Sequence, residues 1–217
     1  RAGGVLERAG HTEASVDISK LSKLNHSAVI CEVMNEDGRM ARLKDLYKFS
    51  IKHNIKIASI EDLIAYRLRN EKLIKKISSK TISLKNLKKI EFINYQNKLN
   101  ESKQHVIKKG QLSTDKSIRV RVISIKDKNS KLILKDPKVK NSLKYLSKFS
   151  NFILIIINNK KFDKNDNENM TLRYYGIGAQ IIKDLKVKNM ILVTRNKKKI
   201  IGLEGYGLKI KKQEIIS

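Results

Sequence analysis

The chain has 217 residues, a formal net charge of +27, 40% hydrophobic residues and 6% aromatic residues, and it contains no tryptophan. This length accommodates one large domain or two small ones, with cores built mainly from Ile, Leu and Val. No apolar run approaches the roughly 20 residues of a membrane-spanning helix, and the first residues lack the pattern of a signal peptide. We therefore expect a cytoplasmic protein with no membrane partner.

Cys31 is the single cysteine of the chain. An internal disulfide is excluded, and so is a zinc site that requires two or more thiolates. A lone cysteine is most simply a small buried hydrophobic residue. We therefore expect no zinc cofactor and a buried Cys31.

The positive charge is spread along the whole chain rather than gathered in one run. A strongly basic chain can be a nucleic-acid binder, and this alternative stays open. The lysines here accompany abundant Ile and Asn, and the few aromatic residues are not interleaved with the basic runs. Compositional drift in an AT-rich genome explains such a bias, so we expect no nucleic-acid partner.

The first 75 residues alternate predicted helices and strands. The predicted helices cover 14–24, 43–53 and 63–77, the last with Ser59 as its N-cap. The run 28–34 is almost continuously apolar, which is typical of a buried strand, and a second strand is predicted over 55–60. Between them, residues 35–38 have the composition of a turn.

Beyond residue 78, strand-like stretches separated by polar turns dominate the sequence. The predicted strands are 89–95, 118–125, 131–134, 151–157, 189–194 and one near 207–212. A charged loop is predicted over 160–169 and a helix over 177–185. The pattern indicates an α/β (α+β) fold with two domains, 1–75 and 76–217.

Three runs in the first 70 residues carry the most specific signal. They are Gly3–Asp17 (GGVLERAGHTEASVD), Val29–Arg42 (VICEVMNEDGRMAR) and Ile60–Arg67 (IEDLIAYR). In this order and spacing they resemble the C-terminal part of 3,4-dihydroxy-2-butanone 4-phosphate synthase, a lyase of riboflavin biosynthesis. The resemblance implies conversion of D-ribulose 5-phosphate to L-3,4-dihydroxy-2-butanone 4-phosphate and formate, with Mg²⁺ or Mn²⁺ as cofactor and a homodimer as the assembly.

The resemblance also implies roles for particular residues. His11 falls on a metal-ligand position and Glu32 on a catalytic carboxylate. The substrate-binding positions are Arg8, Ala9, Gly10, His11, Thr12 and Glu32. A hard cation would stabilise an enediolate of the sugar phosphate, and a carboxylate on a strand would transfer protons.

Taken without the resemblance, the same residues have simpler interpretations. His11 is then a solvated residue of a glycine-rich turn, and Glu32 is an edge-strand carboxylate. We expect Glu13 and Asp17 to be capping or solvated acids rather than metal ligands.

An acidic loop of this family, which carries the second metal ligand, has no counterpart in the 217 residues. The sequence also opens without Met, which favours a fragment or a processed chain. We therefore expect the chain by itself to release no formate from ribulose 5-phosphate. A catalytically dead scaffold or dimerisation protein is the alternative.

The second half resembles GTP cyclohydrolase II. The resemblance rests on Tyr175–Leu185, Met190–Ile200 and Gly202–Leu208, with weaker matches at His105–Gly110 and Arg121–Ser124. It implies a zinc site of three cysteines, but Lys126 stands at the first of these positions and no cysteine follows Cys31.

Without thiolates, the second half cannot hold the zinc that would activate a water molecule. Arg173 matches the catalytic arginine of the cyclohydrolase, whereas Thr194 and Lys199 match positions that contact GTP. We interpret these three as vestigial, in a degenerate domain kept for folding, dimerisation or solubility and without cyclohydrolase activity. Residual nucleotide binding is the alternative.

Overall fold

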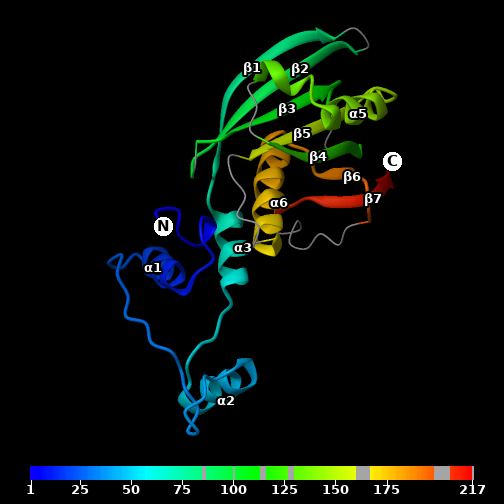
Figure 1. Cartoon of the computed structure of the whole chain (residues 1–217). Helices are drawn as coiled ribbons and strands as arrows, with labels where there is room; N and C mark the ends of the chain where they lie inside the picture. Colours follow the sequence, from blue (N-terminus) through cyan, green and yellow to red (C-terminus); the bar gives the residue numbers. More distant parts are fainter. Residues whose placement is uncertain are drawn as a thin grey trace. The chain divides into compact units, whose positions relative to one another are not determined.

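The computed structural model describes residues 1–84, 87–99, 101–112, 116–126, 130–159, 167–197 and 206–216. The chain divides into two compact units, Arg1–Arg67 and Leu68–Ser217 (Figure 1). No helix of the described residues is both long enough and apolar enough to cross a membrane.

The first unit is built from short helices. These are the 3₁₀ helix η1 (Gly4–Leu6) and the α-helices α1 (His11–Leu21), α2 (Leu43–His53) and α3 (Ile60–Asn70), of which α3 continues past the unit boundary. The predicted N-cap of α3 is confirmed, because the Ser59 hydroxyl accepts a hydrogen bond from the backbone N–H of Asp62 at 3.0 Å. The helix predicted over 43–53 is also confirmed, and the Asp45 carboxylate accepts from the N–H of Arg42 at its start.

The two strands predicted in the first unit are wrong. Residues 28–33 and 55–59 have no regular secondary structure, and Met34 makes only an isolated bridge with Met40. Val29 is fully exposed and Ile55 is half exposed. A strand needs a hydrogen-bonded neighbour and a covered face, and neither segment has a partner strand among the described residues of this unit.

The second unit is organised around one seven-stranded sheet, so the mixed α/β fold class is confirmed. Its strands are β1 (Ile74–Leu84), β2 (Leu87–Asn97), β3 (Lys103–Lys109), β4 (Ile118–Lys126), β5 (Phe152–Asn159), β6 (Asn189–Thr194) and β7 (Lys209–Ile215). They lie in the order β1-β2-β3-β5-β4-β6-β7. The pairs from β1 to β5 are antiparallel, whereas β5, β4, β6 and β7 are mutually parallel.

Three helices connect the later strands of this sheet. They are α4 (Ser130–Ile133), α5 (Pro137–Leu146) and α6 (Asn167–Asp184). The hydrophobic core on one face joins Val139 and Leu146 of α5 to strand residues such as Ile107 and Leu154. The crossover through α5 runs from β4 to β5, and the crossover through α6 returns from β5 past β4 to β6, in the opposite direction along the sheet. Right-handed connections then place the two helices on opposite faces.

Most sequence predictions for this unit hold, with two kinds of error. The strands predicted over 89–95, 118–125, 151–157 and 189–194 are confirmed, and the helix over 177–185 is the end of the longer α6. Residues 131–133 are helical in α4 and residue 134 is in a turn, so this segment is not extended. Residues 74–77 belong to β1 rather than to the preceding helix. Of the predicted loop 160–169, residues 160–166 lie outside the described residues, and residues 167–169 form the start of α6.

Candidate functional site

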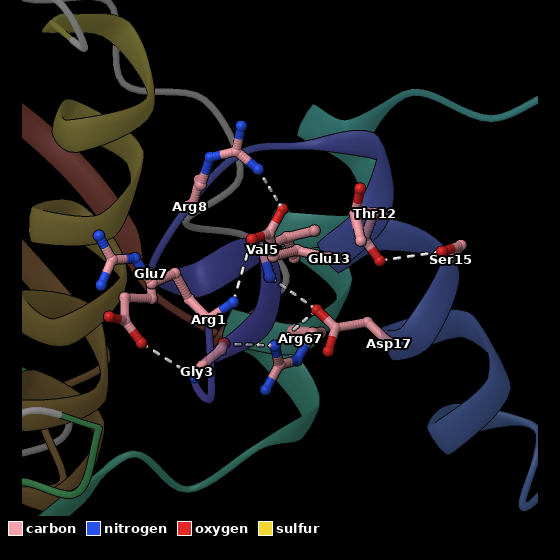
Figure 2. Close-up of polar contacts among 10 residues, drawn as sticks. All are labelled: Arg1, Gly3, Val5, Glu7, Arg8, Thr12, Glu13, Ser15, Asp17 and Arg67. Atoms are coloured by element: carbon pink, nitrogen blue, oxygen red, sulfur yellow. Dashed lines mark hydrogen bonds and ion pairs between the residues drawn. The ribbon is translucent and has the colours of Figure 1, made fainter. Parts of the chain in front are cut away.

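A network of buried carboxylates fixes the glycine-rich turn that precedes α1 (Figure 2). Asp17 is 3% exposed and accepts hydrogen bonds from the Val5 N–H at 2.7 Å and from Nη1 of Arg67 at 2.8 Å. The same Arg67 nitrogen donates to the carbonyl oxygen of Gly3 at 2.9 Å. One carboxylate and one guanidinium therefore tie η1, α1 and α3 together.

Gly4 is required by this arrangement. Its φ is +60°, a backbone conformation that L side chains rarely adopt. A Cβ added at Gly4 would also lie 2.1 Å from Oδ1 of Asp17. The carboxylate of Asp17 thus occupies the space that any side chain at this position would need.

Glu13 makes a second, adjacent set of contacts. It accepts hydrogen bonds from the backbone nitrogen of Arg1 at 3.0 Å and from Nη1 of Arg8 at 2.8 Å. The hydrogen bond to Glu13 thus fixes the side chain of Arg8, a predicted substrate-binding residue, just before the start of α1 (Figure 2).

Of the two simpler interpretations of Glu13 and Asp17, the solvated one is wrong, because they are 7% and 3% exposed. They lie four residues apart, so they share one face of α1. Together with the glycines ahead of the helix, this spacing was the available signal for a carboxylate-anchored turn. Arg67 was missed as their partner, and only the fold brings it to Asp17.

The predicted substrate-binding stretch lies at the N-terminus of α1. His11 and Thr12 are exposed in the first turn, Arg8 is exposed, and Ala9 and Gly10 are half-buried before it. A helix N-terminus presents unpaired backbone N–H groups and a partial positive charge, which suit an anionic oxygen. The stretch 8–12 is therefore open to solvent and electrostatically suited to a phosphorylated ligand.

Glu32 lies in a different environment from the one predicted. It is exposed in an irregular segment, not buried in a strand, because residues 28–33 have no partner strand among the described residues of this unit. Cys31 is likewise exposed, so its predicted burial is wrong.

The predicted metal site rests on a single residue, His11, among the described residues. They contain no group of three or more His, Cys, Asp and Glu side chains that could hold a metal ion. His11, with its imidazole exposed, can supply one ligand. Mg²⁺ is bound octahedrally, mainly by oxygen atoms, and it usually keeps several water ligands. Water, substrate oxygens or additional carboxylates would therefore complete such a site.

In the second unit, one of the three predicted cyclohydrolase positions lines a cavity between the later residues of β4 and β6. Thr194 ends β6 and lines this cavity of about 290 Å³. The other lining residues are Arg121, Val122, Ile123, Ser124, Lys138, Leu192, Val193 and Arg195. Arg173 falls within α6, but its side chain lies outside the described set, as does all of Lys199. Lys126, at the first predicted cysteine position, is the last residue of β4.

Two family profiles match this chain. Residues 1–66 match 3,4-dihydroxy-2-butanone 4-phosphate synthase, and residues 157–215 match GTP cyclohydrolase II.

Similar proteins match almost the whole chain. A riboflavin biosynthesis protein RibBA from Aquifex aeolicus is 38% identical over 97% of this chain and 58% of its own length. A 3,4-dihydroxy-2-butanone 4-phosphate synthase from Sulfurospirillum multivorans is 37% identical over 97% of this chain and 57% of its own length. The chain therefore spans less than two thirds of the length of these relatives.

A solved structure shares the fold of the chain. It is RibBX, a two-domain 3,4-dihydroxy-2-butanone 4-phosphate synthase from A. baumannii, with a TM-score of 0.76 and 30% sequence identity. The similarity covers 99% of this chain and 62% of that protein.

Proposed function

We propose that this chain, in which part of a 3,4-dihydroxy-2-butanone 4-phosphate synthase is fused to a GTP cyclohydrolase II-like domain, serves riboflavin biosynthesis by acting on D-ribulose 5-phosphate. The products are L-3,4-dihydroxy-2-butanone 4-phosphate and formate. The proposal includes a divalent cation, Mg²⁺ or Mn²⁺, a homodimer and a cytoplasmic location.

The observation that carries the proposal is the anchored turn before α1. Asp17 and Glu13 are buried, and their bonds to Val5, Arg67 and Arg8 hold residues 8–12 in place. His11 and Thr12 are exposed at the N-terminus of α1, where backbone N–H groups face an incoming ligand. The arrangement supports His11 as a metal ligand and the stretch 8–12 as a substrate-binding segment.

In this proposal each residue has one chemical task. Arg8 and the N–H groups at the start of α1 bind anionic oxygens of the sugar phosphate. His11 supplies an imidazole ligand to the cation, which when bound would stabilise the negative charge that develops on the sugar oxygens. Glu32 moves protons to and from the substrate carbons.

The proposed active site requires protein residues in addition to those of the described first unit. Glu32 must come to the same site as His11, and the coil 28–33 that carries it must be ordered for this. We propose that strand pairing by a further part of a synthase, including the acidic loop, orders this coil. The coil has the apolar composition of a strand, and Val29 and Ile30 are exposed in it, which supports such a pairing.

Formate release from ribulose 5-phosphate tests the proposal. We expect the purified chain alone to be inactive. A chimera that adds, ahead of Arg1, the part of the Aquifex aeolicus relative that precedes its match to this chain should release formate in the presence of Mg²⁺. Activity of the isolated chain would refute the need for further residues, whereas an inactive but folded chimera would refute the assignment of the first unit.

For the second unit we propose a structural role without cyclohydrolase activity. The chain has no thiolate beyond Cys31 with which to build a zinc site of three cysteines. Incubation with GTP and Zn²⁺ should therefore yield neither formate nor a pyrimidine product. Zinc-dependent turnover of GTP would overturn this assignment.

A further inference from the structure

The cavity between β4 and β6 lies at a special position in the sheet. The two strands pair only from Ile118–Met190 to Val120–Leu192, whereas β4 continues to pair with β5 as far as Lys126. Beyond Val120 the strands β4 and β6 therefore separate, and their next residues line the cavity. The chain winds from β4 to β5 on one side and then to β6 on the other, and open parallel sheets bind ligands at the carboxyl ends of strands at such a point.

The charges around this cavity are not balanced. Arg121, Lys138 and Arg195 line it, and none of its described lining residues is an acid or an amide. Arg121 is only 6% exposed. Its Nε donates to the hydroxyl of Ser142 at 2.8 Å, and its Nη1 is buried with no hydrogen-bond partner in the part of the chain that the structure describes.

A buried guanidinium with a neutral partner and a second cation nearby is unfavourable. Burial lowers the pKa of Arg121, and the charge of Arg195 lowers it further. An anion in the adjacent cavity would offset both effects, because a nearby opposite charge favours the charged form of a buried group.

We propose that this cavity binds a phosphate dianion, either as orthophosphate or as the phosphate group of a small phosphomonoester, without zinc and without recognition of a purine base. Two guanidinium groups, one ammonium group and the hydroxyls of Ser124 and Thr194 are the donors that a tetrahedral oxyanion takes. The apolar wall formed by Val122, Ile123, Leu192 and Val193 accommodates a short carbon chain.

The same lining disfavours a guanine nucleotide. The donor groups of a base edge are read by carboxylate or amide oxygens, and the described lining residues have none in their side chains. The described lining therefore suits a phosphate group better than a guanine base. The site also does not depend on synthase activity, so it stands or falls separately from the function proposed above.

Two lysines of α5 provide a matched pair of variants. Lys138 lines the cavity, and its Nζ donates to the backbone oxygen of Ser124 at 3.2 Å. Lys140 is two residues away on the same helix, is also exposed, and is not among the lining residues. Both substitutions to Met remove one charge at an exposed position, so both variants should fold.

Binding is measured on the full chain at constant ionic strength by calorimetry with orthophosphate, ribulose 5-phosphate and GTP. We expect Lys138→Met to weaken orthophosphate binding by roughly tenfold or more, as for loss of a charged hydrogen-bonding group, and Lys140→Met to leave it within about twofold. Ribulose 5-phosphate binding that is tighter than orthophosphate binding and is weakened by Lys138→Met identifies a sugar phosphate as the ligand of this cavity, and equal binding of the two identifies orthophosphate.

Three results would overturn the proposal. The first is an absence of saturable orthophosphate binding. The second is equal weakening by Lys138→Met and Lys140→Met, which would show a diffuse effect of the net charge. The third is GTP binding far tighter than that of orthophosphate and unaffected by Lys138→Met, which would show a nucleotide site elsewhere.

Discussion

Replacement of Asp17 by Asn tests the carboxylate that anchors the turn before α1. The Asp17 carboxylate is 3% exposed and accepts bonds of 2.7 Å from the Val5 N–H and 2.8 Å from Nη1 of Arg67. Removing one partner of a buried ion pair costs about 3–5 kcal/mol. Arg67 would keep its bond to the Gly3 carbonyl, and Asn would keep one acceptor oxygen. We therefore expect Asp17→Asn to lower the local stability of the turn by ~3 kcal/mol, at the lower end of this range.

Hydrogen exchange measures this loss locally, since the turn can open without unfolding of the second unit. A change of ~3 kcal/mol corresponds to about 100-fold faster exchange of the backbone amides between Gly3 and Arg8. Asp37→Asn is the matched control, because Asp37 has a side chain that is 55% exposed and pairs with Arg39 at 3.5 Å. Such an exposed pair contributes about 0–1 kcal/mol, so the amides of the turn should be unaffected. If Asp17→Asn changed their exchange no more than Asp37→Asn does, the anchoring role of Asp17 would be refuted.

Other substitutions test further parts of the structure. Gly4→Ala should speed exchange of the same amides at least as much, since a Cβ would lie 2.1 Å from the Asp17 carboxylate oxygen; unchanged exchange would contradict the required φ of +60°. Gln180→Met should lower the free energy of unfolding of the second unit by about 2–4 kcal/mol, because the buried Gln180 amide makes three hydrogen bonds to backbone atoms. An unchanged melting temperature would contradict this role of Gln180. Burial raises the pKa of Glu214, but hydrogen bonds from Arg119 and Tyr145 bring it below the ordinary 4.5. The stability from this group is therefore present above pH 4.5 and lost as the pH falls further, and Glu214→Gln should flatten that part of the profile of melting temperature against pH.

The sequence predicted the second unit well where the local pattern and the tertiary environment agree. The run that became β5 is apolar at nearly every position, as expected for a strand buried on both faces. α5 was missed although its signals were present, since Asp136 is the N-cap and Pro137 occupies the first helical turn. β1 was missed because it is an edge strand with Lys and Ser at its exposed positions, so its apolar pattern is weak.

The first unit shows what local pattern alone cannot determine. Residues 28–34 and 55–60 have strand composition, but a strand forms only where a neighbouring strand supplies hydrogen bonds. The buried roles of Glu13 and Asp17 depend on long-range partners, above all on Arg67, fifty positions away from Asp17. The candidate site was therefore predictable as the stretch 8–12, whereas the network that supports this stretch was not.

The most direct test of the synthase assignment is formate release by the chimera described above, measured with two matched pairs of variants. His11→Ala and Glu32→Gln should each lower the rate by about 10²-fold or more, as expected for groups that bind the cation or transfer protons. His26→Ala and Glu36→Gln, which alter exposed residues of the same types in the same unit, should leave the rate nearly unchanged. Raising the Mg²⁺ concentration should partly restore the His11→Ala variant but not the Glu32→Gln variant. If the chimera were active and neither His11→Ala nor Glu32→Gln slowed it more than its control, the assignment of the active site would be wrong.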